Sequence, residues 1–463
     1  MLNEKNESKA ESKAAKRLNA LFDEGSFNEI DAFALSNGEQ SSVICGFGTV
    51  YGSPVYAFAQ NIEVVDGAVD RVQASKIKKV YELAAKTGAP IVGIYDSFGA
   101  KIDGGIDTLA ALGEMLSWSN NISGVVPQIS VVAGTCAGTT AMIAAAADIV
   151  VMSEEAKLFM TAPSILEAKG DKEETATVKA CLKSGVAQLS AKDDMEAVEQ
   201  ARELLAVLPA NNLSVAPAVD SVAVAGCEQA FRDLSVEKDA LKLIENTADE
   251  NSVTELSAEF ATNAKTALAS VDGNTTGFVA FEGVAIDIDA CSKVARFVRF
   301  CDAFAIPVVT FVDAEGFEAN SKAENSGVVR YASMLSNAYA EATCPKISVI
   351  TGKAIGAAYI ALAGKGSNAD FVIAWADAVI SALEPISAVS MLWNDRISKG
   401  ETREDLVEEY STTLANAFSA AANGNVDDVI DPALTRAKLI NTLNIICGKR
   451  VSTLPKKHSN MPL

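Results

Sequence analysis

The chain has 463 residues, which is long for a single hydrophobic core and predicts two domains. Hydrophobic residues make up 49% and charged residues 21%, a balance typical of a folded α/β protein and not of a disordered one. The net charge of −21 argues against a nucleic-acid or anionic-membrane surface, because both need clustered Lys and Arg.

The numbers and spacing of histidine and cysteine limit which metal sites and catalytic systems the chain could form. The sequence has one histidine, His458, and its eight cysteines never form a C-x-x-C pair, so we expect no bound metal. A Ser-His-Asp or Cys-His system would also lack its histidine, because His458 lies in a basic tail. Scattered cysteines and an N-terminal stretch without the apolar core of a signal peptide predict a cytoplasmic protein.

The first half of the chain predicts alternating strands and helices. Residues 41–67 alternate between apolar and polar positions around Gly-Ser-Pro turn signals, which indicates a hairpin or meander. Residues 75–90 have helical spacing and end in Gly-Ala-Pro, and a buried strand is expected at 91–97. A glycine loop and a helix at 106–119 follow. This order predicts right-handed βαβ units.

Residues 115–147 contain no charged side chain, and this run exceeds the length of a membrane span. It is interrupted by Pro127, by glycines and by many Ser, Thr and Asn residues. We therefore expect a buried parallel strand and its following helix, with no insertion into a membrane.

One phrase occurs twice. PQISVVAGTCAG at 127–138 returns as PKISVITGKAIG at 345–356, with no gap between the two copies. Asp96 and Asp313 fall in nearly the same register, 217 positions apart. The second copy is again preceded by a predicted helix and strand, so the chain consists of two homologous halves.

Between the halves, residues 165–265 are charged and rich in Ala, Glu and Lys, which predicts helical linkage. We place the domain boundary within this region, giving domains 1–230 and 231–463. The chain after Trp393 is expected to be helical up to its basic end.

Both copies of the phrase place small residues where a buried strand ends and a helix begins. Small residues let a ligand approach the backbone, and the first helical turn presents free N–H groups with the positive end of the dipole. One such donor stabilises a developing oxyanion by about 3–4 kcal/mol. Tight strand–helix packing would require the same small residues and stays open as the alternative. The backbone groups concerned are those of Gly138, Thr139, Gly356, Ala357 and Ala358.

Side chains suited to acid–base catalysis are few. Glu154, Glu155 and Glu384 follow the strands after each turn and could transfer protons, although solvated loop carboxylates are the simpler interpretation. An enzyme with two oxyanion sites and no base would need a substrate that brings its own.

Several longer strings carry a family resemblance. They include VYAFAQ, DSFGAKIDGG, SGVVPQISVVAGTCAG, IDACSKVARFVRFCDAF, NAYAEATCPKISVITGKA and the terminal KKH-x-N-x-PL. In these strings and their order, the chain resembles the carboxyltransferase subunits of biotin-dependent acyl-CoA carboxylases and of sodium-pumping acyl-CoA decarboxylases. The resemblance implies an α/β fold of two tandem crotonase-like spiral domains.

The resemblance also implies roles for the two turns. Acyl-CoA would lie against the N-terminal half, where the amides of Gly138 and Thr139 would hold the enolate oxygen. Carboxybiotin would lie against the C-terminal half, where Ala357 and Ala358, with Gly356 beside them, would polarise the ureido oxygen. The freed biotin nitrogen would then take the α-proton, which supplies the missing base.

Ligand-lining residues and partners follow from the same resemblance. No biotin attachment motif occurs, so biotin would arrive on a separate carrier protein. A biotin carboxylase or a membrane decarboxylase subunit would complete the system, and the chain would form a homodimer or homohexamer. The lining residues would be Phe98, Gly99, Ala100 and Lys101 on the coenzyme A side, and Gly316, Phe317 and Ile360 in the second half.

The sequence departs from the family pattern at these sites. DSGGAR is replaced by DSFGAK, CAGGA by CAGTT, and RKAYGGAYD by GKAIGAAYI. These changes keep two alternatives open. The chain could bind or scaffold acyl-CoA without catalysis, or it could hydrate or isomerise an acyl-CoA by means of side-chain acids and bases.

Overall fold

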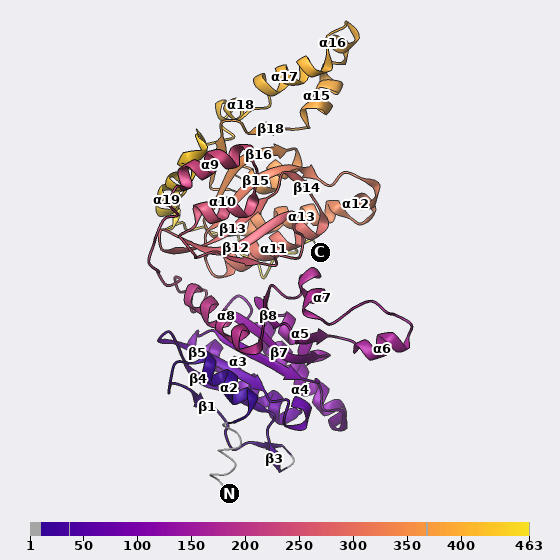
Figure 1. The fold of residues 1–463 in the computed structure, drawn as a ribbon, viewed down its shortest axis with the longest axis vertical. Coiled ribbons are helices and arrows are strands. Elements are labelled where there is room, and N and C mark those ends of the chain that lie inside the picture. The colour runs from indigo at the N-terminus through magenta and orange to yellow at the C-terminus, as the bar shows by residue number, and fades with distance from the viewer. Residues whose placement is uncertain (1–10, 37, 367–368, 463) are drawn as a thin grey trace. The chain divides into compact units, whose positions relative to one another are not determined.

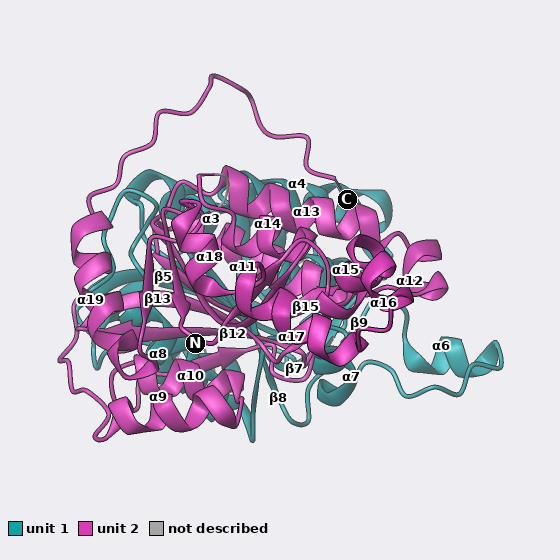
Figure 2. Cartoon of the chain, turned by 90° about the horizontal axis from the view of Figure 1, so that it is seen from above, with its two compact units in different colours: residues 1–217 teal, residues 218–463 magenta. Residues whose placement is uncertain are grey.

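In the computed structural model the chain divides into two compact units, residues 1–217 and 218–463 (Figure 2). The structure describes residues 11–36, 38–366 and 369–462. A boundary between 230 and 231 would cut helix α9 (Cys227–Val236), which lies wholly within the second unit. The two units are described separately.

The first unit, which runs from indigo to magenta in Figure 1, is built on a mixed sheet. Its strand order is β1-β4-β5-β6-β7-β8-β10, with β9 paired to β7. The hairpin expected at 41–67 is formed by β4 and β5, which pair in antiparallel fashion, and β5, β6, β7, β8 and β10 continue as parallel neighbours. The strands are β1 (Asn28–Glu29), β4 (Val43–Val50), β5 (Ser53–Gln60), β6 (Ile91–Ser97), β7 (Gln128–Ala137), β8 (Ile149–Ser153), β9 (Lys157–Phe159) and β10 (Leu189–Ala191), with β2 (Leu35–Ser36) and β3 (Glu39–Gln40) as a separate pair.

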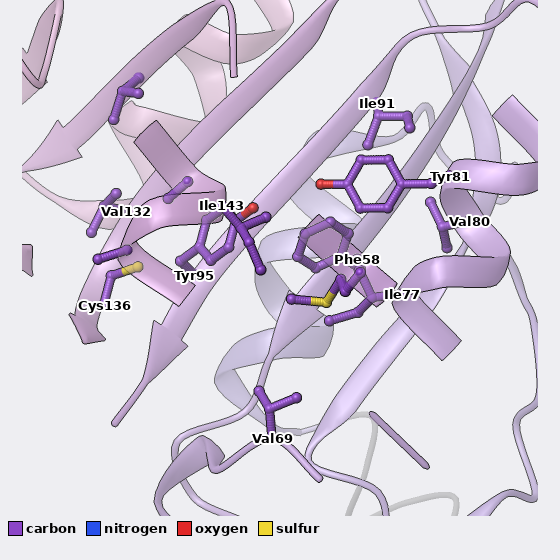
Figure 3. Packing of buried hydrophobic residues seen from close by; sticks show 14 of the residues in the cluster. Phe58, Val69, Ile77, Val80, Tyr81, Ile91, Tyr95, Val132, Cys136 and Ile143 are labelled. Atoms are coloured by element: carbon purple, nitrogen blue, oxygen red, sulfur yellow. The ribbon is translucent and has the colours of Figure 1, made fainter. Parts of the chain in front are cut away.

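Helices connect and cover these strands. The longest are α3 and α4, and α3 begins at a capping box formed by Asp70 and Gln73 and ends at Gly88 in a left-handed conformation. The buried face of α3 contributes Ile77 to a core in which the rings of Phe58 and Tyr95 pack edge to face (Figure 3). The helices are α2 (Lys13–Leu21), α3 (Arg71–Thr87), α4 (Gly105–Asn121), α5 (Thr139–Ala145), α6 (Pro163–Ala168), α7 (Val178–Lys183) and α8 (Asp194–Val207), with short 3-10 turns at Val65–Gly67 and Ile102–Gly104.

The uncharged run at 115–147 forms the end of α4, strand β7 and helix α5, as the sequence predicts. Along residues 11–36, 38–366 and 369–462, the structure contains no helix that is both long and apolar enough to span a bilayer.

The second unit repeats this architecture. Its sheet has the order β11-β12-β13-β15-β16-β17-β19, with β14 paired to β15 and β18 paired to β16. The strands are β11 (Thr254–Leu256), β12 (Ala264–Val271), β13 (Asn274–Phe281), β14 (Val284–Ile286), β15 (Val308–Phe317), β16 (Lys346–Ile355), β17 (Phe371–Trp375), β18 (Val379–Ser381) and β19 (Asp428–Ile430).

In both units, an antiparallel pair leads into parallel strands on either side of the strand that carries the repeated phrase. Phe278 and Phe311 stack at 6.4 Å in the core of the second unit, beside the buried Trp375. The expected tandem α/β architecture is confirmed. The helices are α9, α10 (Ala240–Thr247), α11 (Ile288–Ala303), α12 (Ser321–Asn325), α13 (Val328–Glu341), α14 (Ala357–Ala363), α15 (Pro385–Leu392), α16 (Asn394–Ser398), α17 (Arg403–Thr413), α18 (Ala417–Ala422) and α19 (Thr435–Ile446), with a 3-10 turn at Pro432–Leu434.

The region 165–265 is only partly the helical linkage that its composition predicts. Strand β10 pairs in parallel with β8 of the first sheet, and β11 pairs in antiparallel fashion with β12 of the second. Each strand is three residues long, so its place in a sheet depends on its neighbour and not on its own composition.

Candidate active site

The two copies of the repeated phrase end in turns with nearly the same backbone geometry. Gly138 has φ 62° and ψ −128°, and Gly356 has φ 56° and ψ −129°. This region of backbone space is readily open only to glycine. Each turn follows a central strand of its sheet at the carboxyl end, where ligands bind in open α/β sheets.

The amides of the two turn glycines are used within the fold. Gly138 N–H donates to the Phe159 carbonyl at 2.8 Å, and Gly356 N–H donates to the Ser381 carbonyl at 2.8 Å. These bonds tie each turn to the short strand beside it. The glycines therefore shape the turns, and their own N–H groups already have acceptors in this structure.

The residues that follow each turn glycine begin a helix. Helix α5 begins at Thr139 and helix α14 at Ala357, and the first N–H groups of a helix have no acceptor within it. Ala357 is exposed, while Ala358 is buried. Of the five expected backbone groups, those of Thr139, Ala357 and Ala358 belong to the first turn of a helix.

The loop expected to line the first turn does lie beside it. Gly99 has φ 94°, and a Cβ placed there would lie 2.8 Å from the Ala137 carbonyl oxygen, so this loop packs directly on the turn. Lys101 N–H donates to Val69 O at 2.9 Å, which fixes the end of the loop. Phe98 is 60% exposed.

Further apolar side chains surround this loop. Ile102 and Ile106, which follow the loop, and Met142 on α5 are all exposed. Exposed apolar side chains near this loop thus alternate with charged ones, since Lys101 Nζ lies 3.7 Å from the exposed Asp103 carboxylate.

The residues that border the second turn, here called its rim, differ from those that border the first. Gly316 has φ 112°, and Phe317 beside it is half-buried. Ile360, on α14, is 58% exposed. Lys353 Nζ lies 2.7 Å from Glu315 Oε1, and this hydrogen-bonded carboxylate raises the pKa of Lys353.

The Glu315–Lys353 ion pair was not anticipated from the sequence. Glu315 stands in the register of Phe98, and Lys353 stands in that of Thr135. A position-by-position alignment of the two halves would have shown that both charged residues stand beside the second turn, where the first half has uncharged residues.

Of the side chains that could act as acids, bases or nucleophiles, the expected carboxylates and the histidine are exposed and the nearest thiol is inert. Glu154, Glu155 and Glu384 are exposed, and so is His458. Cys136 lies two residues before Gly138, but complete burial raises the pKa of its thiol, so it stays protonated at neutral pH. No cluster of three or more His, Cys, Asp or Glu residues that could hold a metal is found among the described residues.

Comparisons with known proteins cover nearly the whole chain. The sequence profile described as "Carboxyl transferase domain" matches residues 5–461. The chain is 37% identical to methylmalonyl-CoA decarboxylase subunit alpha of Veillonella parvula, over 99% of this chain and 95% of that protein. It is 35% identical to the methylmalonyl-CoA carboxyltransferase 12S subunit of Propionibacterium freudenreichii subsp. shermanii, over 99% of this chain and 93% of that protein.

A solved structure agrees with these relatives. Transcarboxylase 12S, crystallised with methylmalonyl-coenzyme A and methylmalonic acid and described as a hexamer, superposes with a TM-score of 0.92. The match has 36% sequence identity and covers 99% of this chain and 94% of that one.

Proposed function

The chain belongs to the carboxyl transferase family, and from this premise we propose that it transfers a carboxyl group between biotin on a separate carrier protein and a short or dicarboxylic acyl-CoA thioester. The observation that carries the proposal is the pair of matching turns, each followed by helix-start amides that have no acceptor within their helix. Two such sites suit a reaction in which two carbonyl oxygens, one on each substrate, gain negative charge.

Methylmalonyl-CoA and propionyl-CoA form the proposed substrate pair. The relatives include decarboxylase, carboxylase and carboxyltransferase subunits that are named for one or the other of these esters. The 12S structure was solved with methylmalonyl-CoA bound. Both directions of transfer are represented among these relatives, so the proposal covers either direction.

The first unit is proposed to hold the acyl-CoA. The Thr139 amide would donate to the thioester oxygen and stabilise the enolate, a contribution of about 3–4 kcal/mol for one well-placed donor. The apolar surface around Phe98 would pack against the uncharged part of the ligand, and Lys101 would face its anionic groups. The β-branched side chain of Thr139 leaves this amide in place.

The second unit is proposed to hold biotin. When bound, biotin supplies the atom that carries the carboxyl group between the two sites. The donors at the second turn suit it, because a ureido carbonyl oxygen accepts from backbone N–H groups such as those of Ala357 and Ala358. Alanine at 357 keeps the N–H donor, and Gly356 keeps the backbone geometry of the first turn. Gly316, Phe317 and Ile360 would border the ring.

Partners and location complete the proposal. A biotin carrier protein would deliver the cofactor, and a biotin carboxylase or a membrane decarboxylase subunit would load or unload it. By analogy with the 12S protein, we propose a homodimer or homohexamer in the cytoplasm.

Carbon dioxide release from malonyl-, methylmalonyl- and glutaconyl-CoA, with and without free biotin at high concentration, tests this function. Biotin-dependent loss of methylmalonyl-CoA is expected. Carbon dioxide release without biotin would indicate a different crotonase-type reaction, in which the enolate left by decarboxylation is protonated without a carboxyl acceptor. No reaction with any ester, from protein shown to be folded, would favour a binding or scaffold role.

A further inference from the structure

We propose that Asp96 and Asp313 are positioning residues whose buried carboxylates hold a strand bulge in place and thereby aim the two turns. This inference rests on the proposed function, because it assigns the turns a catalytic purpose. The geometry of the bulges is independent of that function.

The strand before each turn carries the same irregularity. In the first unit, Tyr95 pairs with Val132 and Ser97 with Cys136, so three residues of β7 lie opposite the single residue Asp96. The bulge in β7 thus spans 133–135.

In the second unit, Val312 pairs with Ile350 and Ala314 with Ala354, so three residues of β16 lie opposite Asp313. This bulge spans 351–353. Bulges of this kind bend a strand, and they are common beside active sites.

Each carboxylate fills its bulge and accepts a backbone N–H that the bulge removes from the ladder. Thr135 N–H donates to Asp96 Oδ1 at 3.2 Å, and Lys353 N–H donates to Asp313 Oδ1 at 2.8 Å. A Cβ placed on Gly134 would overlap the Asp96 carboxylate, and one on Gly352 would overlap that of Asp313. Glycine at both positions therefore lets the carboxylate lie against the backbone.

At the other end of each bulge, a cationic side chain donates a hydrogen bond to the backbone carbonyl. Arg17 Nη2 donates to Ala133 O at 3.3 Å, and Lys238 Nζ donates to Thr351 O. Arg17 Nη1 also donates to Asp96 Oδ2 at 2.8 Å. The N–H of the third bulge residue and the carbonyl of the first are thus both satisfied by side chains, as buried backbone groups require.

The bulge changes which strand lies beside the turn. Before it, β7 pairs with β8, and after it β7 pairs with β9; in the same way β16 passes from β17 to β18. The turn glycine follows three residues after the N–H that the carboxylate holds. The direction in which the helix-start amides point is therefore set at the bulge.

The chain provides matched controls at the opposite ends of the same strands. Asp148 Oδ2 accepts Gln128 N–H at 2.8 Å at the start of β7, and Asp370 Oδ2 accepts Lys346 N–H at 2.8 Å at the start of β16. These carboxylates make the same type of bond to the same strands, but they lie away from the turns.

The test compares Asp313→Ala with Asp370→Ala in the full chain, with free biotin as the acceptor of the carboxyl group. Two quantities are measured: steady-state transfer from methylmalonyl-CoA, and amide hydrogen exchange of the segment 353–358. Asp313→Ala is expected to lower kcat by about 100-fold, the effect of misplacing reacting groups by about 1 Å, with little change in the KM for the acyl-CoA. Exchange of 353–358 should become faster.

Asp370→Ala is expected to leave kcat within about threefold of the wild type and exchange at 353–358 unchanged. Asp313→Asn, whose amide oxygen can still accept the Lys353 N–H, should recover most of the activity and also serves if Asp313→Ala fails to fold. Equal effects of Asp313 and Asp370 variants on kcat and on exchange would overturn the proposal. If the wild type transfers no carboxyl group, the proposed function fails, while the exchange comparison still decides the role of Asp313 in ordering the turn.

Discussion

The two halves of the molecule share a backbone device and differ in the side chains around it. The φ and ψ angles of Gly138 and Gly356 agree within 6°, since 62° compares with 56° and −128° with −129°. The rims, however, contrast an exposed Phe98 with the ion pair between Glu315 and Lys353. The two halves keep the same turn geometry while the residues around it differ, as the proposal of two ligands that share a carbonyl group requires.

The polar groups that support each turn have also diverged. In the first unit, Arg17 bridges Asp96 and Asp194, both at 2.8 Å. In the second unit, Lys238 Nζ donates to the equivalent carbonyl, that of Thr351. The same Nζ lies 5.3 Å from the centre of the Trp375 ring. The bulge is satisfied in both cases, so its shape is retained although the cation is not.

The largest expected effect comes from the turn glycines. Gly356→Ala should lower kcat for carboxyl transfer by about 100-fold or more, because alanine must leave this conformation and its Cβ would lie 3.1 Å from Ala382 O. Gly424→Ala is the control, since it has a left-handed φ of 77° and nothing within 4 Å of its Cβ. The control should cost about 1–2 kcal/mol of stability and leave kcat unchanged. If Gly356→Ala behaves like Gly424→Ala, the turn is not required for catalysis.

A buried ion pair is expected to contribute strongly to the stability of the second unit. Arg436 Nη2 lies 2.7 Å from Asp249 Oδ1, and both side chains are buried. Asp249→Asn should destabilise this unit by about 3–5 kcal/mol, as expected when one partner of a buried pair is removed. Hydrogen exchange resolved by unit measures the effect. The partly exposed pair of Lys438 and Asp428 is the control, and Asp428→Asn should cost less than about 1 kcal/mol.

The pair of Asp249 and Arg436 also predicts how the stability of the second unit depends on pH. Burial raises the pKa of Asp249, but hydrogen bonds from Arg436 and the Gly273 amide outweigh it and lower the pKa below the ordinary value. A carboxyl group whose pKa is lower in the folded state stabilises above its unfolded pKa of about 3.9. This stabilisation is lost as the pH falls through the folded-state pKa. Acid unfolding of the second unit should therefore shift to higher pH in Asp249→Asn than in Asp428→Asn, and equal midpoints would contradict the assignment.

The apolar rim predicts a smaller, selective effect. Phe98→Ala should raise the KM for methylmalonyl-CoA by about tenfold, because it removes an aromatic contact worth about 1.5 kcal/mol. The KM for free biotin should stay the same. Phe33→Ala is the control, because Phe33 is also exposed but lies outside both turns. A rise in the KM for biotin would reverse the assignment of ligands to the two units.

The smallest effect is expected at the charged rim. Glu315→Gln removes the partner of Lys353, and an exposed ion pair contributes about 0–1 kcal/mol to stability, so Tm should change little. Loss of the carboxylate releases the Lys353 ammonium for anionic ligands, so the KM for free biotin should fall by up to about threefold at low salt and return to the wild-type value at high salt. An altered KM for methylmalonyl-CoA alone would contradict this assignment.

Sequence reasoning located the turns because their requirement is local. Gly138 and Gly356 adopt a conformation that only glycine takes readily, and the strand and helix around each follow from apolar patterning. What the sequence did not reveal depends on distant neighbours. The Gly138 amide is occupied by Phe159 O through the pairing of β9, and the bulges depend on how β6 and β15 align with their neighbours. Asp96 and Asp313 were recognised as register markers, but only the fold shows the N–H groups that they accept.

Transfer of a labelled carboxyl group tests the central claim most directly. Methylmalonyl-CoA labelled in its free carboxyl group would be incubated with the wild-type protein and free biotin, and with the Gly356→Ala variant in parallel. The account predicts label on biotin, or released as carbon dioxide only when biotin is present, with both signals lost in the variant while methylmalonyl-CoA still binds. Label that stays on methylmalonyl-CoA with folded wild-type protein, or is released equally without biotin, would contradict it.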